Sequence, residues 1–260
     1  MRCRMGSFEY LEAHFAGAAF GRHRHDTYTI ALTTHGVQQF RYRGSRLTST
    51  PGRVIVLHPD EPHDGQAGTD AGFAYRSVNI APREIQRAIG RRVLPFVDPA
   101  VVDSPGLRSI LERMTSVFET PLDAPDCEDA LFEVASELDR LAGNRQRSRP
   151  IDTTSVALAR EYIDDRLLDG FDMVSLERAT GRNRWQLSRD FRALLGTSPY
   201  RYLILRRLDR ARRLLLSGRG LAETALACAF SDQSHFGRHF KQAYGISPGQ
   251  WLSFRSSGVG

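Results

Sequence analysis

Short runs of β-branched and aromatic residues, separated by turns that contain glycine or proline, characterise the first third of the chain. The clearest runs begin at Thr27, Val37, Arg53 and Phe73. Several short strands at this spacing are typical of a small barrel or jelly roll. The pattern therefore predicts a β-barrel over about residues 7–80.

From Ala81 onward the apolar residues recur at helical steps instead. We expect a short helix over residues 83–90 and longer ones over 107–118 and 128–142. In the last of these, Leu131, Val134, Leu138 and Leu141 form an apolar face. One interpretation is that these helices cover the barrel.

A polar stretch separates this part from the rest of the chain. Residues 143–150 end in proline and offer nothing to a core, so we place a linker at 143–152. A helix is expected from there to about Leu168, with Thr153 or Thr154 as its N-cap.

Two pairs of short helices with the same layout follow. In the first pair Asp172 and Asn183 are the expected N-caps, and Gly181 suits the break between the helices. Two helices that pack through apolar faces, the second presenting polar side chains, form a helix-turn-helix. The residues expected to point inward are Met173, Leu176, Ala179, Leu187, Phe191 and Leu194.

The second pair spans residues 221–245, with Asp232 as the expected N-cap of its second helix and Gly245 at its end. An ordinary αα-hairpin with a solvated outer face is the alternative interpretation. The residues expected to point inward are Leu221, Ala225, Leu226, Cys228, Phe236 and Phe240.

A long helix over Tyr200–Ser217 is expected to connect the two pairs. Its 18 residues would span about 27 Å at 1.5 Å per residue. This length is close to the roughly 34 Å between successive major-groove faces of DNA. The connector is therefore consistent with two helices that read DNA one turn apart.

The charge is unevenly distributed. Of the net charge of +6, residues 151–260 account for all, with 17 basic and 11 acidic residues, which leaves 19 of each in the first 150. A chain of 260 residues is long enough for two domains. A neutral half joined to a basic half suggests that only the second half meets a polyanion.

Neither a membrane segment nor a disulfide framework is expected. No apolar run approaches the roughly 20 residues that a membrane helix needs, and the start lacks the pattern of a signal peptide. Three scattered cysteines, Cys3, Cys127 and Cys228, form no CxxC pair. This cysteine usage fits a reducing cytoplasm.

Two stretches of the second helix pair carry a family resemblance. The run Phe230-Ser231-Asp232-Gln233-Ser234-His235-Phe236 and the ending Gly245-Ile246-Ser247-Pro248 resemble the signature region of the AraC/XylS family of bacterial transcription regulators. The resemblance continues back to about Phe171. The order of His23-Arg24-His25-Asp26, Gly36, Pro51-Gly52, His58-Pro59 and His63-Asp64-Gly65 is similar, less specifically, to the cupin-type sensor domain of many members.

The resemblance implies an α+β fold of two domains. Residues 1–142 would form a cupin-like β-barrel with a helical extension, which binds an effector and dimerises, and 153–257 an all-α domain with two helix-turn-helix motifs joined by a long helix. Helices within 107–142 would then supply a homodimer interface, the other interpretation of their apolar faces. Double-stranded DNA, a small-molecule effector and RNA polymerase are the implied partners.

Residues for contact with DNA are carried over by position. Base-reading candidates are Arg184, Trp185, Ser188 and Arg189 in the first motif and Gln233, Ser234, Gly237 and Arg238 in the second. Arginine can bind guanine and glutamine adenine through two hydrogen bonds. Arg192, Arg206, Arg210 and Lys241 are better placed for phosphates. Ala229 departs from the glycine usual in the family, at a cost of about 1 kcal/mol if its φ is positive.

Histidines are the main candidates for the effector site. His23 and His25 would face the same side of a strand, and His63 could join them. Metal-binding cupins add a carboxylate after such a pair, and none is suitably placed here, so we expect no metal cofactor. Tyr28, Tyr42 and Arg76 are further candidates for the pocket. The alternatives to an effector-controlled regulator are a metal-dependent cupin enzyme with a DNA-binding appendage and a constitutive DNA binder with an inert barrel.

Overall fold

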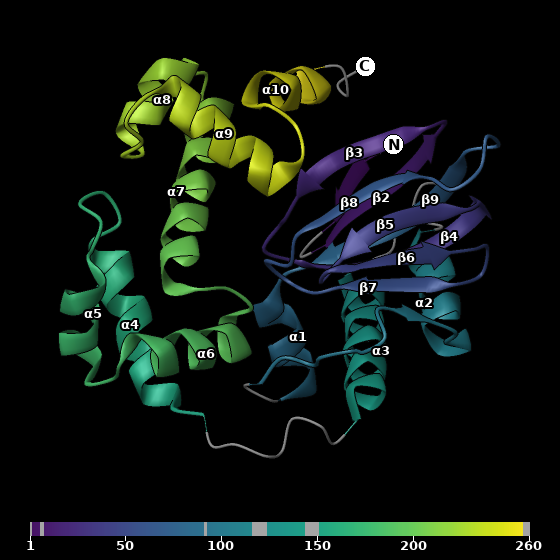
Figure 1. Ribbon diagram of the computed structural model, residues 1–260, viewed down its shortest axis with the longest axis horizontal. Coiled ribbons are helices and arrows are strands. Elements are labelled where there is room, and N and C mark those ends of the chain that lie inside the picture. Colours follow the sequence, from purple (N-terminus) through teal and green to yellow (C-terminus); the bar gives the residue numbers. More distant parts are fainter. Residues whose placement is uncertain (1, 6–7, 91–92, 116–123, 144–150, 257–260) are drawn as a thin grey trace. The chain divides into compact units, whose positions relative to one another are not determined.

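The computed structural model describes residues 2–5, 8–90, 93–115, 124–143 and 151–256. The chain forms two units, one of residues 1–22 and 26–150 and one of residues 23–25 and 151–260. The first unit combines two sheets with helices, and the second is helical (Figure 1). Most of the linker predicted at 143–152 lies outside the described residues.

Two sheets form the β part of the first unit. One has the strand order β1-β2-β9-β4-β7-β10 and the other β3-β8-β5-β6. β1, β2, β3, β6, β8 and β10 were not among the clearest runs of the sequence, and β1 and β10 lie outside the range of 7–80 predicted for the barrel. The strands are β1 (Arg2–Met5), β2 (Phe8–Phe15), β3 (Ala18–His23), β4 (Tyr28–Gly36), β5 (Gln38–Tyr42), β6 (Ser45–Ser49), β7 (Val54–Leu57), β8 (His63–Ala67), β9 (Phe73–Ile80) and β10 (Val101–Val102).

Both faces of the larger sheet are apolar, and the pairing of its strands determines which residues share a face. Val78 of β9 pairs with Tyr10 on one side and Ile30 on the other, and Ile30 pairs with Val56. Because paired residues point to the same face, these four fully buried side chains form one row. The opposite face packs Tyr75 and its neighbours against Phe40 and Tyr42 of the smaller sheet.

Three helices follow the strands: α1 (Pro82–Ile89), α2 (Pro105–Thr115) and α3 (Ala124–Ala142). Leu107 and Leu111 of α2 and Val134 and Leu138 of α3 join the cluster that contains Val78. The expectation that these helices cover the barrel is confirmed. Each large apolar side chain buried there contributes roughly 1.5–3 kcal/mol. Residues 116–118 of the predicted second helix lie outside the described part.

Residues 151–256 of the second unit form helices joined by short loops. The helices are α4 (Thr153–Asp165), α5 (Met173–Thr180), α6 (Arg184–Leu195), α7 (Pro199–Leu216), α8 (Leu221–Ala227), α9 (Gln233–Tyr244) and α10 (Pro248–Ser256). The two helix-turn-helix pairs and their long connector are confirmed. Helix α10 was not predicted. Its Trp251 lies in the core with Phe236 and Phe240, so the second motif is closed by a further helix.

Three details of the prediction were wrong. Asp152, and neither Thr153 nor Thr154, caps α4, because its carboxylate accepts from the Ser155 N–H. Ala179 is exposed and Thr180 buried, since the Thr180 hydroxyl donates to the Leu176 carbonyl within the same helix.

The third error concerns α8. Leu226 is 67% exposed, although the spacing placed it inward, and Thr224 is buried instead. A short helix leaves room for only a narrow buried face, and Ala225 and Cys228 occupy it.

No helix formed by the described residues is both long and apolar enough to cross a membrane.

Candidate nucleic-acid interface

Helix α6 is fixed at both ends by local bonds. The Asn183 side chain accepts from the main-chain N–H groups of Trp185 and Gln186, and Gly181 has a φ of 65° at the break before it. Gly196 ends the helix in the left-handed conformation, which a glycine adopts without steric cost. The predicted caps and break are confirmed.

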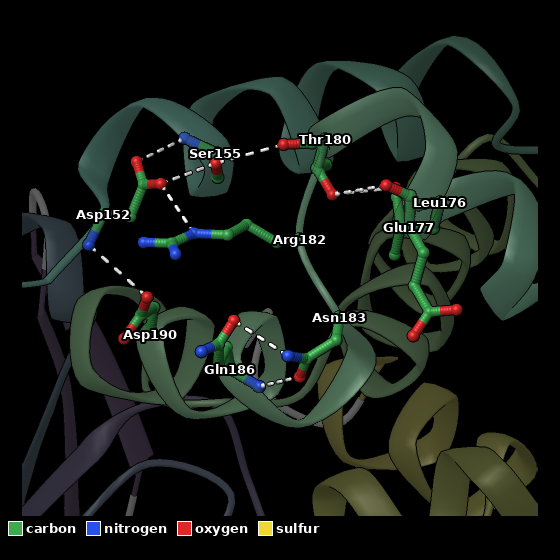
Figure 2. A network of polar contacts seen from close by, with 9 residues as sticks. All are labelled: Asp152, Ser155, Leu176, Glu177, Thr180, Arg182, Asn183, Gln186 and Asp190. Carbon is green, nitrogen blue, oxygen red and sulfur yellow. Dashed lines mark hydrogen bonds and ion pairs between the residues drawn. The ribbon is translucent and has the colours of Figure 1, made fainter.

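A polar network ties α6 to the start of α4 (Figure 2). Asp152 accepts from the Ser155 hydroxyl at 2.8 Å and from Nε of Arg182 at 2.8 Å. The Asp152 N–H in turn points at the carboxylate of Asp190 in α6, at 3.4 Å. Hydrogen bonds from Ser155 hold the pKa of the Asp152 carboxyl below its usual value. Through these bonds, the loop between α5 and α6 is connected to the start of α4.

The outer face of α6 carries the side chains that sequence singled out. Trp185 is 74% exposed, and Arg189 and Arg192 are exposed as well, whereas Ser188 is half-buried. Arg184 is exposed but bound to Glu177 of α5. Leu187 and Phe191 point inward as predicted. The helix thus presents basic and aromatic groups on a rigid support.

Helix α9 is built in the same way. Asp232 accepts from the His235 N–H at 2.6 Å, and Gly245 ends the helix with a φ of 77°. Phe236 and Phe240 are fully buried. The outer face consists of the exposed Gln233, Ser234, Arg238 and Lys241 together with the half-buried Gly237.

Ala229, at the break before α9, has a φ of 55°. A left-handed conformation strains any residue with a Cβ atom, which explains why glycine is the easier choice here. The positive φ on which the expected cost depended is therefore present at Ala229. The second motif nonetheless keeps its helix-turn-helix fold.

Arginines of the connector α7 differ in their surroundings. Arg206 lies 3.4 Å from Asp164 and 3.5 Å from Asp209, and Arg210 is half-buried. Arg207, which sequence reasoning missed, donates to the carbonyls of Leu167, Leu168 and Ala229. The sequence feature that could have identified Arg207 is its spacing of four residues from both Leu203 and Ala211, which are buried.

A histidine pair on α9 was also missed. Nε2 of His235 lies 2.9 Å from Nε2 of His239, and their spacing of four residues places them one turn apart. Burial and the neighbouring charge of His235 lower the pKa of His239 to about 4. His239 is therefore neutral at pH 7.

Two tyrosines proposed for an effector pocket lie in the core of the first unit. The Tyr28 hydroxyl donates to the Pro95 carbonyl at 2.7 Å, and the Tyr42 hydroxyl lies 2.6 Å from Nδ1 of His58. His58, which sequence reasoning did not select, accepts from the Val97 N–H through Nε2 and stacks on Phe96. Burial raises the pKa of both tyrosines, and burial with the Arg43 charge lowers the pKa of His58 to about 4.

Of the other effector candidates, His63 of β8 is the cross-strand partner of Tyr42 of β5. Arg76 of β9 pairs with Glu12 of β2 at 2.9 Å. His63 is buried, and its Nδ1 lies 3.0 Å from the Glu61 carbonyl. His23 and His25 group with the second unit, and their rings are 5.7 Å apart.

Two open hollows mark the surface of the first unit. One, of about 340 Å³, lies between His14 and His35, and the other, of about 320 Å³, lies between Arg22 and Asp64. Neither is lined by any of the six effector candidates.

Comparison with known proteins identifies both parts of the chain. Residues 6–135 match the family model of the AraC-like ligand binding domain, and residues 176–253 match that of a helix-turn-helix domain. The uncharacterised HTH-type transcriptional regulator YbfI of Bacillus subtilis (strain 168) is 24% identical over 83% of this chain and 81% of its own length. RhaS, an HTH-type transcriptional activator of Escherichia coli O81 (strain ED1a), is 25% identical over 92% of this chain and 89% of its own length.

The fold as a whole is similar to that of ToxT from Vibrio cholerae O395, whose crystal structure contains (E)-4-(8-methylnaphthalen-1-yl)but-3-enoic acid. The TM-score is 0.64 at 11% sequence identity, and the match covers 95% of this chain and 99% of ToxT.

Proposed function

The chain belongs to the AraC family of transcriptional regulators, and we propose that it binds two adjacent major grooves of DNA through α6 and α9 under the control of a small-molecule effector. The observation that carries this proposal is the pair of capped helices with exposed polar and basic faces, joined by the 18-residue helix α7. Phosphate-binding and base-reading side chains on two such helices are what specific recognition of DNA requires.

Roles are proposed for individual side chains of both helices. Trp185, Ser188 and Arg189 of α6 face bases. Arg184, the remaining candidate of the first motif, is bound to Glu177 and is given no contact with DNA in this proposal. On α9 the same role falls to Gln233, Ser234 and Arg238, whereas Gly237 offers no side chain to read with. Phosphate contacts are assigned to Arg192, Arg206, Arg210 and Lys241, which position the protein without specifying sequence.

The effector is proposed to bind the N-terminal unit. Support comes from the match of residues 6–135 to a ligand-binding family and from the small molecule bound to ToxT. A switch requires that the effector bind two states of the protein with different affinity. The proposed contact residues in this unit are Tyr28, Tyr42, His63 and Arg76, whereas His23 and His25, which group with the second unit, remain candidates from the sequence alone.

Further partners belong to the same proposal. Phe132 of α3 is 58% exposed, which supports a homodimer formed through α2 and α3. The curated relatives are transcriptional regulators, which supports a role without catalysis, in the cytoplasm where the chromosome and RNA polymerase lie.

A map of the genomic DNA bound in the host tests the proposal. Discrete sites with two half-sites about one helical turn apart are expected, and diffuse binding would contradict it. On such a site, Arg238→Ala is expected to weaken specific binding by about 1–3 kcal/mol, and Lys241→Ala to weaken binding to all sequences alike. Equal losses for both variants on specific and random DNA would contradict the assigned roles.

A further inference from the structure

The first residue of α6 is bound by a carboxylate from the preceding helix. Oε1 of Glu177 accepts from the Arg184 main-chain N–H at 2.6 Å and from Nε of Arg184 at 3.2 Å. Oε2 of Glu177 lies 3.4 Å from Nη2 of Arg184. One side chain therefore holds both the backbone and the guanidinium of the residue that begins the helix.

Glu177 completes the capping of α6. Asn183 accepts from Trp185 and Gln186, so with Glu177 the first three N–H groups of the helix all have an acceptor. A negative charge also suits the positive end of a helix dipole. The bond from the Arg184 N–H, followed by those from its side chain, lowers the pKa of the Glu177 carboxyl. The carboxyl is ionised at neutral pH, and the pair carries no net charge.

The second motif is different at this position. Glu177 lies seven residues before Arg184, and the residue seven before Gln233 is Leu226. Leu226 has no group that accepts a hydrogen bond, and its side chain is exposed. Among the described residues, a carboxylate from the preceding helix binds the start of α6 but has no counterpart at α9.

We propose that Glu177 is a positioning residue that raises sequence specificity by keeping Arg184 from the DNA phosphates. The inference rests on the proposed function. A phosphate contact strengthens binding to every sequence, so withholding one lowers non-specific affinity without loss of base contacts. Base reading in the first motif then falls to Trp185, Ser188 and Arg189, and the Glu177 charge itself repels phosphate.

Four full-length proteins test this: the wild type, Glu177→Gln, Arg184→Gln and the double variant. Glutamine keeps an oxygen that accepts from the Arg184 N–H, so α6 retains its start. Affinity is measured against salt concentration on a duplex carrying a mapped site and on a random duplex of equal length. For Glu177→Gln we expect random-duplex affinity to rise about 3- to 10-fold and the log–log salt slope to steepen by about 0.9, the value of one phosphate contact.

Arg184→Gln and the double variant test whether the effect of Glu177→Gln depends on Arg184. Arg184→Gln is expected to leave the wild-type slope unchanged, and the double variant to return to it. Glu161→Gln removes the same charge from an exposed position of α4 and is expected to leave the slope within about 0.3 of the wild type. The proposal is overturned if Arg184→Gln alone lowers the slope by about 0.9, if Glu177→Gln changes nothing, or if Glu161→Gln has the same effect as Glu177→Gln.

A measurement on the free protein tests the role of Glu177 independently of the proposed function. Hydrogen exchange of the Arg184 amide in the free protein is expected to be at least about 10-fold faster in Glu177→Ala than in the wild type, and near wild type in Glu177→Gln. If the wild type prefers no DNA sequence, the proposed function fails while a protected amide still identifies Glu177 as a positioning residue. An unprotected amide in a protein that does bind specifically overturns the inference alone.

Discussion

Nη1 of Arg207 donates to the main-chain carbonyl of Ala229 at 3.0 Å. The same guanidinium reaches the carbonyls of Leu167, at 2.7 Å, and Leu168, at 3.2 Å. These carbonyls lie after α4, whereas Ala229 precedes α9, so a single side chain of α7 joins the two helix-turn-helix halves. The loop after α4 and the break before α9 are therefore bound to the same residue of α7.

Replacement of Arg207 by methionine is expected to lower the free energy of unfolding by about 1.5–3 kcal/mol, because three carbonyls lose a charged donor. Denaturation of the isolated variant in urea measures this loss. Arg213→Met, at an exposed position of the same helix, is the control and is expected to change stability by less than about 0.5 kcal/mol. Similar losses in both variants would contradict the bridging role.

Ala229→Gly is expected to stabilise the protein by about 0.5–1 kcal/mol, since glycine relieves the strain of a φ of 55°. The measurement is the midpoint of thermal unfolding. Ala179→Gly, at an exposed helical position, should have the opposite effect and cost about 0.5–1 kcal/mol. Destabilisation by Ala229→Gly would show that the left-handed conformation is not a source of strain.

Stability is expected to fall between about pH 6.5 and pH 4 because of His58. Its pKa is lowered to about 4 in the fold, whereas an unfolded histidine binds a proton below about 6.5. In this window the unfolded state binds more protons, so the free energy of unfolding decreases with falling pH, by on the order of 3 kcal/mol in total.

The variant His58→Gln measures this contribution by difference. Its free energy of unfolding is expected to be lower at pH 7 but to vary less between pH 6.5 and 4 than that of the wild type. His239, whose pKa is also lowered to about 4, is present in both proteins, so its contribution cancels. Parallel pH profiles would contradict this, because they would show that the pKa of His58 is the same in the folded and unfolded states.

Asp152→Ala is expected to destabilise the second unit by about 1–2 kcal/mol, because α4 loses its N-cap and Arg182 its partner. Thr154→Ala, at the exposed alternative cap position, is the control and should cost less than about 0.5 kcal/mol. The difference is read from urea denaturation followed by the fluorescence of Trp185 and Trp251, both of which lie in this unit. A larger loss of stability in Thr154→Ala than in Asp152→Ala would indicate that Thr154, and not Asp152, is the N-cap of α4.

Local signals in the sequence were sufficient for the helical unit. The caps Asp172, Asn183 and Asp232 and the left-handed glycines were found because each acts through its own neighbours within three residues. The errors arose where such local patterns were not sufficient. Asp152 was assigned to the linker because the polar stretch before it masked the start of the helix, and Leu226 was placed inward because spacing alone cannot tell how wide a buried face is.

Contacts between residues distant in sequence were beyond prediction. Nothing near His58 announces that its ring nitrogens would meet Tyr42 and Val97, which are 16 and 39 residues away. The spacing of Arg207 from Leu203 and Ala211 distinguishes it from Arg206, but nothing local identified the carbonyls that it would bind. Glu177 was likewise unremarked, since its partner lies across a turn on another helix. Bonds of this kind depend on the tertiary fold, which periodicity does not specify.

The bond between Glu177 and Arg184 also limits how freely this regulator can be retargeted. A library that varies α6 from its first residue leaves Glu177 in place, facing whatever side chain replaces Arg184. An acidic residue there sets two carboxylates against each other, and an apolar one leaves Glu177 without its guanidinium partner. Positions 177 and 184 must therefore be exchanged together, whereas α9, which follows Leu226, accepts a grafted first turn without a matching change in α8.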